Sequence, residues 1–150
     1  REIQKYWFGR QLAIARELDL PVIIHCVRAY NDTVAMLEAK GIKRVIFHGF
    51  TGSVELAGQL ARRGYYLSFG VRSLASARTV EAMKAVGVEQ LFLETDTADT
   101  EIEQVYARAA KELSVGKDEL KESICRNFKT IFGTWETGWS GRNCCSGRKS

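Results

Sequence analysis

The sequence predicts an α/β fold in which parallel strands alternate with helices. Short runs of β-branched and other apolar residues recur four times without the polar alternation of a half-exposed strand. Each run is followed by a segment whose apolar residues repeat at helical spacing. Alternation of this kind requires right-handed crossovers between parallel strands. The pattern allows two architectures, a doubly wound open sheet or half of an eight-stranded (β/α)₈ barrel.

The first half of the pattern comprises two helices and two strands. A helix is predicted over residues 2–18, where Ile3, Trp7, Ile14 and Leu18 fall near one face and Pro21 follows. Strands are predicted at 22–24 and 45–47, each ending in a histidine. The helix between them spans 31–39 and stops at Gly41, because glycine accepts the left-handed conformation common at helix ends.

The second half repeats this order and adds two closing helices. Ser53 is a suitable N-cap for a helix over 53–63, and a strand at 65–69 follows. A helix over 75–86 ends at Gly87 and leads to a strand at 91–94. The two closing helices carry apolar residues at helical spacing, from Ile102 to Leu113 and from Leu120 to Phe132.

Composition indicates one globular domain. The chain has 150 residues, of which 45% are hydrophobic, and a net charge of +4, too small to argue nucleic-acid binding alone. No apolar run approaches the roughly 20 residues of a membrane span, so no membrane association is expected. We assign residues 1–133 to the domain. Residues 134–150 hold no aliphatic side chain and are predicted to be a disordered, non-native tail.

The four cysteines fit neither a disulfide framework nor a paired zinc motif, so a reducing, cytoplasmic compartment is expected. Cys26 lies in an apolar run and Cys125 on a helix face, and both are predicted to be small core residues. The adjacent pair Cys144 and Cys145 has no histidine nearby to complete a metal site.

Metal-binding side chains follow three of the four predicted strands. His25 and His48, the chain's two histidines, each end a strand, and Asp96 follows a third. In parallel α/β folds, ligands bind beyond the carboxyl ends of the strands. Imidazole and carboxylate groups suit zinc, manganese or magnesium. A single strand-end histidine is more often structural than ligating, so the residues alone leave a metal site and a structural role both open.

Two neighbouring features are consistent with an anion site. Residues 48–53 contain glycines that allow a close approach of the backbone, and Ser53 begins a helix whose N-terminus favours phosphate. Arg28, three residues after His25, can clamp a phosphate or carboxylate. An ordinary strand–helix turn with a serine cap and a solvated loop charge explain the same residues equally well.

Three motifs resemble successive signatures of the TatD family. They are Leu-Pro-Val-Ile-Ile-His ending at His25, His-Gly-Phe-Thr-Gly beginning at His48, and Leu-Glu-Thr-Asp ending at Asp96. Their order and separation match the family, and the similarity covers residues 8–133. The three motifs in order are specific, although each alone is weak.

The resemblance implies the C-terminal half of a TIM-type barrel and a divalent-metal-dependent hydrolase of DNA phosphodiester bonds. It implies that His25, His48 and Asp96 bind the metal, with Asp96 also acting as the catalytic base. It implies substrate-phosphate contacts for Arg28, Thr51 and Gly52. The expected cofactor is Mg, Mn or Zn, with two ions in a full-length parent, and the expected substrate of that parent is DNA.

Two family elements have no counterpart in this sequence, namely a His-x-His pair on the first barrel strand and a glutamate on the fourth. We therefore expect this chain to be an inactive or weak nuclease by itself. The alternatives are a non-catalytic truncated fragment and an α/β anion-binding domain. Because a half-barrel has two open sheet edges, self-association is also expected.

Overall fold

The computed structural model describes residues 2–133 and contains one parallel sheet. Its strands are β1 (Val22–His25), β2 (Val45–His48), β3 (Tyr66–Phe69) and β4 (Leu91–Leu93), and their order in the sheet is β1-β2-β3-β4. All neighbouring strands pair in parallel. The predicted α/β class, with its four parallel strands, is therefore confirmed.

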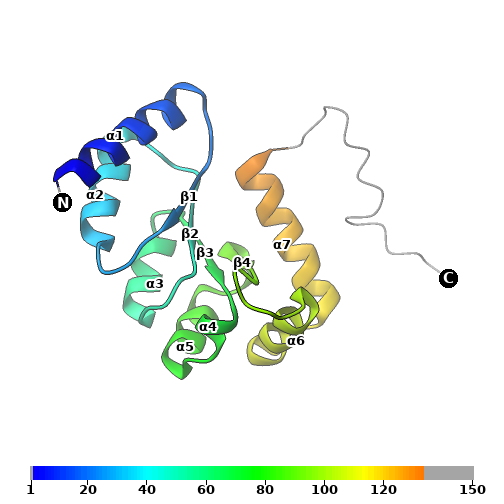
Figure 1. Cartoon of the computed structure of the whole chain (residues 1–150). Coiled ribbons are helices and arrows are strands. Elements are labelled where there is room, and N and C mark those ends of the chain that lie inside the picture. The colour runs from blue at the N-terminus through cyan, green and yellow to red at the C-terminus, as the bar shows by residue number, and fades with distance from the viewer. Residues whose placement is uncertain (1, 134–150) are drawn as a thin grey trace.

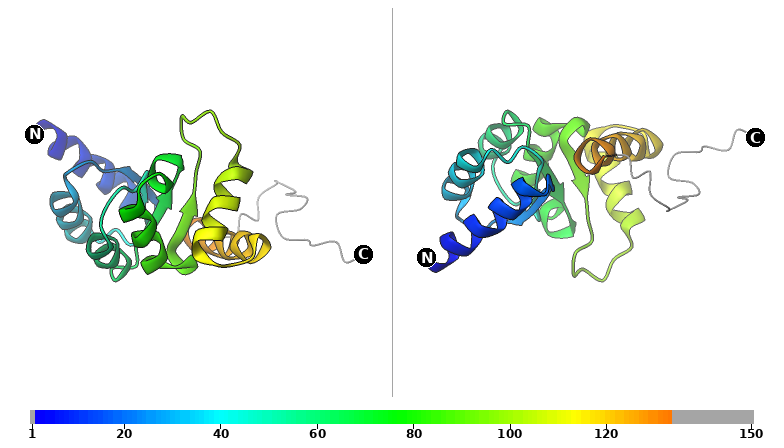
Figure 2. Two further views of the ribbon diagram at one scale, coloured as in Figure 1. Left: turned by 90° about the horizontal axis from the view of Figure 1, so that it is seen from below. Right: turned by 90° about the horizontal axis from the view of Figure 1, so that it is seen from above.

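The helices connect successive strands and then close the domain. They are α1 (Glu2–Glu17), α2 (Tyr30–Lys40), α3 (Val54–Ala61), α4 (Val71–Leu74), α5 (Ala77–Val86), the 3-10 turn η1 (Val88–Gln90), α6 (Ile102–Leu113) and α7 (Lys117–Phe132). Figure 1 shows them following an arc around the sheet, from α1 and α2 beside β1 to α6 and α7 beside β4. The two views of Figure 2 place α1 and α7 on opposite sides of the sheet.

One segment differs from the sequence prediction. The helix expected over 75–86 begins only at Ala77, and the separate short helix α4 precedes it. Ser76 adopts an extended backbone and its hydroxyl accepts a hydrogen bond from the backbone N–H of Thr79. Such a cap marks a new helix start, so the chain turns between α4 and α5 instead of forming one continuous helix.

The core lies between the sheet and the helices. Phe47 of β2, Phe50 and Phe69 of β3 are fully buried. The ring of Phe50 contacts that of Phe69 at a centroid distance of 5.6 Å, and the ring of Phe47 contacts that of Tyr30 at the same distance. Because successive strand residues face opposite sides, a phenylalanine directed to the helices places His48 on the other face of β2.

The apolar face of α1 remains uncovered by the described residues. Leu12 is the one buried residue of α1, whereas Ile3, Trp7 and Leu18 are 75%, 59% and 61% exposed. Ile23 on the edge strand β1 is 60% exposed as well. Exposed apolar groups beside an open sheet edge favour association, and self-association of this chain stays a prediction.

Candidate metal and phosphate site

A cavity of about 640 Å³ lies at the carboxyl ends of the strands. Residues at or just beyond the ends of all four strands line it, including His25, Arg28, Thr51, Arg72, Glu94 and Asp96. The register of β1 and β2 pairs His25 with His48, so the two histidines end neighbouring strands side by side. Their ring centroids are 5.6 Å apart.

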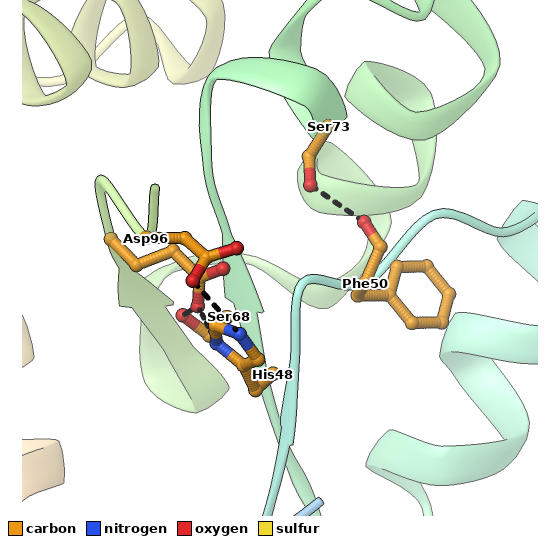
Figure 3. A network of polar contacts seen from close by, with 6 residues as sticks. His48, Phe50, Ser68, Ser73 and Asp96 are labelled. Carbon is orange, nitrogen blue, oxygen red and sulfur yellow. Dashed lines mark hydrogen bonds and ion pairs between the residues drawn. The ribbon is translucent and has the colours of Figure 1, made fainter. Parts of the chain in front are cut away.

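His48 is held by a carboxylate that projects from the end of β4. Its Nδ1 atom lies 2.7 Å from Oε2 of Glu94, and the hydroxyl of Ser68 on β3 donates a hydrogen bond to the same oxygen. Figure 3 shows His48, Ser68 and Asp96 gathered in one network, separate from the hydrogen bond between Ser73 and the carbonyl of Phe50. Three adjacent strands thus meet at one carboxylate.

The second nitrogen of His48 faces Asp96. Nε2 of His48 lies 3.7 Å from Oδ1 of Asp96, too far for a direct hydrogen bond. Metal bonds to imidazole nitrogen and carboxylate oxygen are each about 2.0–2.2 Å long for zinc. The separation and the chemistry of the donors therefore fit a divalent ion shared by His48 and Asp96.

The predicted three-ligand set is only partly brought together. His25 and Asp96 both line the cavity, and His48 lies beside it, in contact with both. Within residues 2–133, however, no three His, Cys, Asp or Glu side chains are grouped closely enough to hold a metal ion. Metal binding by His25, His48 and Asp96 therefore stays a prediction.

Two lining residues adopt a backbone conformation that is uncommon for side-chain-bearing residues. Arg28 has φ = 55° and Asp96 has φ = 49°, both in the left-handed region. This conformation costs roughly 1–2 kcal/mol for an L-residue other than glycine, with aspartate tolerating it better. Strain at two loop positions facing one cavity is typical of a functional site.

The phosphate-contact candidates separate into two groups. Arg28 and Thr51 line the cavity, as predicted for residues that touch a substrate. Gly52 is buried and is not among the lining residues. A Cβ at position 52 would lie 2.5 Å from Cζ of Phe50 and 3.1 Å from Cδ2 of Leu56. The close packing of Phe50 against position 52 is enough to explain why this residue is glycine. A contact between Gly52 and substrate stays a prediction.

Replacing Gly52 by alanine is expected to destabilise the fold by about 1–3 kcal/mol, the typical cost of forcing extra atoms into a packed core. Phe50 is fully buried and has little room to move. Urea denaturation of Gly52→Ala beside Gly64→Ala measures the packing contribution. Gly64 has nothing within 4 Å of an added Cβ but has a positive φ of 78°, so its variant reports backbone strain alone. Equal stability of Gly52→Ala and wild type would contradict the packing explanation.

Glu94 is the site residue that the sequence prediction did not assign. It lies inside the third motif, two positions before Asp96. Strand periodicity does not link the two residues, because β4 ends at Leu93 and Asp96 has a left-handed backbone with φ = 49°. The role of its partner Ser68 could not be predicted from the sequence, because a single serine within an apolar strand does not indicate which residue it will contact.

Tyr30 also lines the cavity but does not provide a base. Burial, and secondarily the charge of Cys26, raise the pKa of Tyr30 to about 12. The phenol is consequently protonated at neutral pH and can only exchange hydrogen bonds. Among the cavity's acids, Asp96 has a side chain that is 52% exposed, which leaves it accessible to water.

The cysteine predictions are only partly met. Cys26 and Cys125 are half-buried, not fully enclosed core residues, and Sγ of Cys26 lies 3.5 Å from Oγ1 of Thr33. The prediction for residues 134–150, with Cys144 and Cys145, lies outside the described residues. Within the described part of the chain, no helix has the length and apolar character needed to cross a membrane.

Fold and site together define a parallel α/β protein of barrel type, with histidines and acids at the carboxyl ends of its strands. The chain belongs to the TatD family, since the profile described as "TatD related DNase" matches residues 1–133. It is 39% identical over 100 residues to a Bacillus subtilis protein named uncharacterized metal-dependent hydrolase YabD, covering 64% of this chain and 39% of that protein. It is 31% identical over 109 residues to the Schizosaccharomyces pombe protein named deoxyribonuclease Tat-D, covering 71% and 35%.

Solved structures show the same fold. The TatD homologue YJJV from Escherichia coli superposes with a TM-score of 0.80 at 24% identity, over 89% of this chain and 57% of that one. A hydrolase TatD family protein from Entamoeba histolytica superposes with a TM-score of 0.73 at 18% identity, over 83% and 56%. These proteins have TIM-type barrels, so the predicted half-barrel is confirmed. The chain spans less than two thirds of each relative.

Proposed function

We propose that this chain carries the C-terminal strand-end residues of a metal-dependent hydrolase that cleaves phosphodiester bonds in DNA. The proposal depends chiefly on one distance: Nε2 of His48 lies 3.7 Å from Oδ1 of Asp96. Both residues lie at the cavity that His25 also lines. Family membership supports the same chemistry, because relatives are named deoxyribonuclease and metal-dependent hydrolase.

His25, His48 and Asp96 are the residues proposed to hold a divalent ion, with Mg, Mn and Zn as the candidates. When bound, such an ion provides a nucleophile at neutral pH and stabilises negative charge on a phosphate oxygen. The protein's part is to supply two imidazoles from the ends of the neighbouring strands β1 and β2, and one carboxylate from the connection that follows β4. Two ions would need more ligands than these three residues provide.

Asp96 is proposed to orient and deprotonate the attacking water. Its side chain is half exposed at the cavity, where a water can reach it. The protonated phenol of Tyr30 is unsuited to that role. Arg28 and Thr51, from the connections that follow β1 and β2, are proposed to contact substrate phosphates from the same cavity. Guanidinium groups bind phosphate through paired, charge-assisted hydrogen bonds.

Cleavage of single-stranded DNA in the presence of Mg²⁺ or Mn²⁺ tests the proposal. We expect at most weak cleavage by this chain, lost on chelation and lost in both His48→Ala and Asp96→Ala. Cleavage that survives both substitutions would contradict the assignment. If the wild-type chain bound Mn²⁺ through these residues but cut no DNA, it would be the non-catalytic fragment. An α/β anion-binding domain would instead bind phosphate with no dependence on metal.

Replacing Arg28 by alanine is expected to weaken binding of single-stranded DNA by about tenfold, since a hydrogen bond to a charged group contributes roughly 1.5 kcal/mol or more. Fluorescence anisotropy with a labelled oligonucleotide measures the change. Arg62→Ala is the matched control, because Arg62 ends α3 and is absent from the lining of the cavity. An equal loss in both variants would indicate general charge attraction without a phosphate contact by Arg28.

A further inference from the structure

We propose that Glu94 and Ser68 form a positioning pair that fixes the tautomer of His48, with its proton on Nδ1 and the lone pair of Nε2 directed toward Asp96. The inference deepens the proposed function and rests on it for its metal-binding consequence. The placement of the proton, however, is a property of the metal-free chain and can be measured separately.

The hydrogen bonds around Glu94 determine where the proton lies. An ionised carboxylate only accepts hydrogen bonds, so a nitrogen 2.7 Å from Oε2 must donate. The hydroxyl of Ser68 donates to the same oxygen and holds it in place. Ser68 is 5% exposed and the side chain of Glu94 is 15% exposed, so water competes little for these bonds. The tautomer of a histidine is set by the hydrogen bond that its other nitrogen makes.

Gly70 leaves part of the space that the side chain of Glu94 occupies. A Cβ at position 70 would lie 3.1 Å from Cγ and 3.2 Å from the carbonyl oxygen of Glu94. A Cβ at position 49 would lie 3.7 Å from Oε1 of Glu94 and 3.6 Å from Nδ1 of His25, and Gly49 has φ = 61°. A side chain at position 70 would therefore press on Glu94. At position 49 the distances are ordinary van der Waals contacts, and the positive φ is what favours glycine there. The carboxylate of Glu94 therefore packs against the carboxyl ends of β2 and β3 and the residues that follow them.

This arrangement prepares His48 to act as a ligand. A neutral imidazole binds a metal ion through the nitrogen that lacks a proton, and here that nitrogen is the one 3.7 Å from Asp96. Without Glu94, the proton is free to move to Nε2, the tautomer that unrestrained histidine favours, and the lone pair then points away from Asp96. Loss of such an orienting partner typically weakens metal affinity by about 10–100-fold.

Nitrogen NMR of the histidine side chains tests the tautomer directly. The chain has two histidines, so assignment needs only the His25→Ala variant. At about pH 8, we expect His48 of the metal-free wild type to carry its proton on Nδ1, the nitrogen that faces Glu94. The proton should shift toward Nε2 in Glu94→Ala and remain on Nδ1 in Glu94→Gln, whose amide oxygen still accepts. A wild-type proton on Nε2 would overturn the proposal without any variant.

Ser68→Ala separates positioning from general stability. We expect it to mix the two tautomers of His48, because Glu94 loses the bond that anchors it. Ser73→Ala is the matched control, since Ser73 is equally buried and donates one hydrogen bond, to the carbonyl of Phe50. It should cost similar stability and leave the tautomer of His48 unchanged. Equal tautomer shifts in the two variants would overturn the assignment of Ser68.

A Mn²⁺ titration by calorimetry links the tautomer to the site. We expect Glu94→Ala to bind Mn²⁺ about 10–100-fold more weakly than wild type, and Glu94→Gln to recover most of the affinity. An unchanged affinity despite a shifted tautomer would overturn the positioning role. A wild-type chain with the proton on Nδ1 but no Mn²⁺ binding would sink the proposed function while supporting the tautomer assignment.

Discussion

Replacing Asp96 by alanine is expected to weaken Mn²⁺ binding by this chain by about 100-fold or more, because removing a ligand costs at least as much as removing the group that orients one. Asp96 provides the carboxylate proposed to face Nε2 of His48 across 3.7 Å. Removing it leaves two neutral imidazoles, which bind hard cations such as Mn²⁺ poorly. Isothermal calorimetry on the metal-free chain measures the affinity.

Asp99→Ala is the matched control for this experiment. Asp99 is an exposed aspartate in the same loop, three residues further on, and is absent from the lining of the cavity. Its replacement removes the same charge from the same region and should change the Mn²⁺ affinity by less than about twofold, since exposed charges are screened by salt. Equal losses in the two variants would mean that net charge, and no specific ligation by Asp96, governs binding.

Replacing Phe47 by alanine is expected to lower the free energy of unfolding by about 3–5 kcal/mol, the usual cost of emptying a buried aromatic position. Phe47 is fully buried on a central strand, and its ring contacts those of Tyr30 and Tyr65 at 5.6 and 5.9 Å. A domain of this size typically has only about 5–15 kcal/mol of stability. The variant should therefore be partly unfolded at physiological temperature.

Phe128→Ala is the matched control, because it makes the same substitution at a position that is much more exposed than Phe47. Phe128 lies on α7, is 49% exposed and packs on Phe132 at a centroid distance of 4.6 Å. Its loss should cost about 1 kcal/mol or less. Urea denaturation followed by circular dichroism gives both values. A smaller cost at Phe47 than at Phe128 would contradict the position of the core between the sheet and the helices.

Strand positions were predictable because buried parallel strands produce a distinct pattern. Runs such as Val45 to Phe47 are apolar without interruption, which distinguishes them from half-exposed strands. The common location of His25 and His48 followed from the same rule, since parallel strands carry their carboxyl ends to one edge. The register that pairs the two histidines confirms this part of the prediction.

The break between α4 and α5 and the role of Gly52 were not predictable in the same way. Ser76 is one of several serines that suit a cap, and only the fold selects among them. Gly52 looked like a backbone position open to a ligand, whereas the neighbouring ring of Phe50 explains it by packing. Both depend on contacts between residues, which helical or strand periodicity does not contain.

The face of α1 illustrates the limit of periodicity. Ile3, Trp7 and Leu18 lie near one face of a helix that forms as predicted, yet they are exposed. An apolar stripe shows that a helix has a surface suited to packing. It does not show which partner covers that surface. Glu94 was missed for a related reason, because its importance arises from contacts with His48 and Ser68 on two other strands.

A zinc titration followed through the nitrogen NMR signals of the two histidines tests the central claim most directly. The measurement observes His25 and His48 themselves, so zinc bound by cysteines elsewhere does not contribute. If one ion is shared at the strand ends, both histidines should respond at the same zinc concentration, and both responses should weaken together in Asp96→Ala. Independent responses, or responses indifferent to Asp96, would contradict a common metal site.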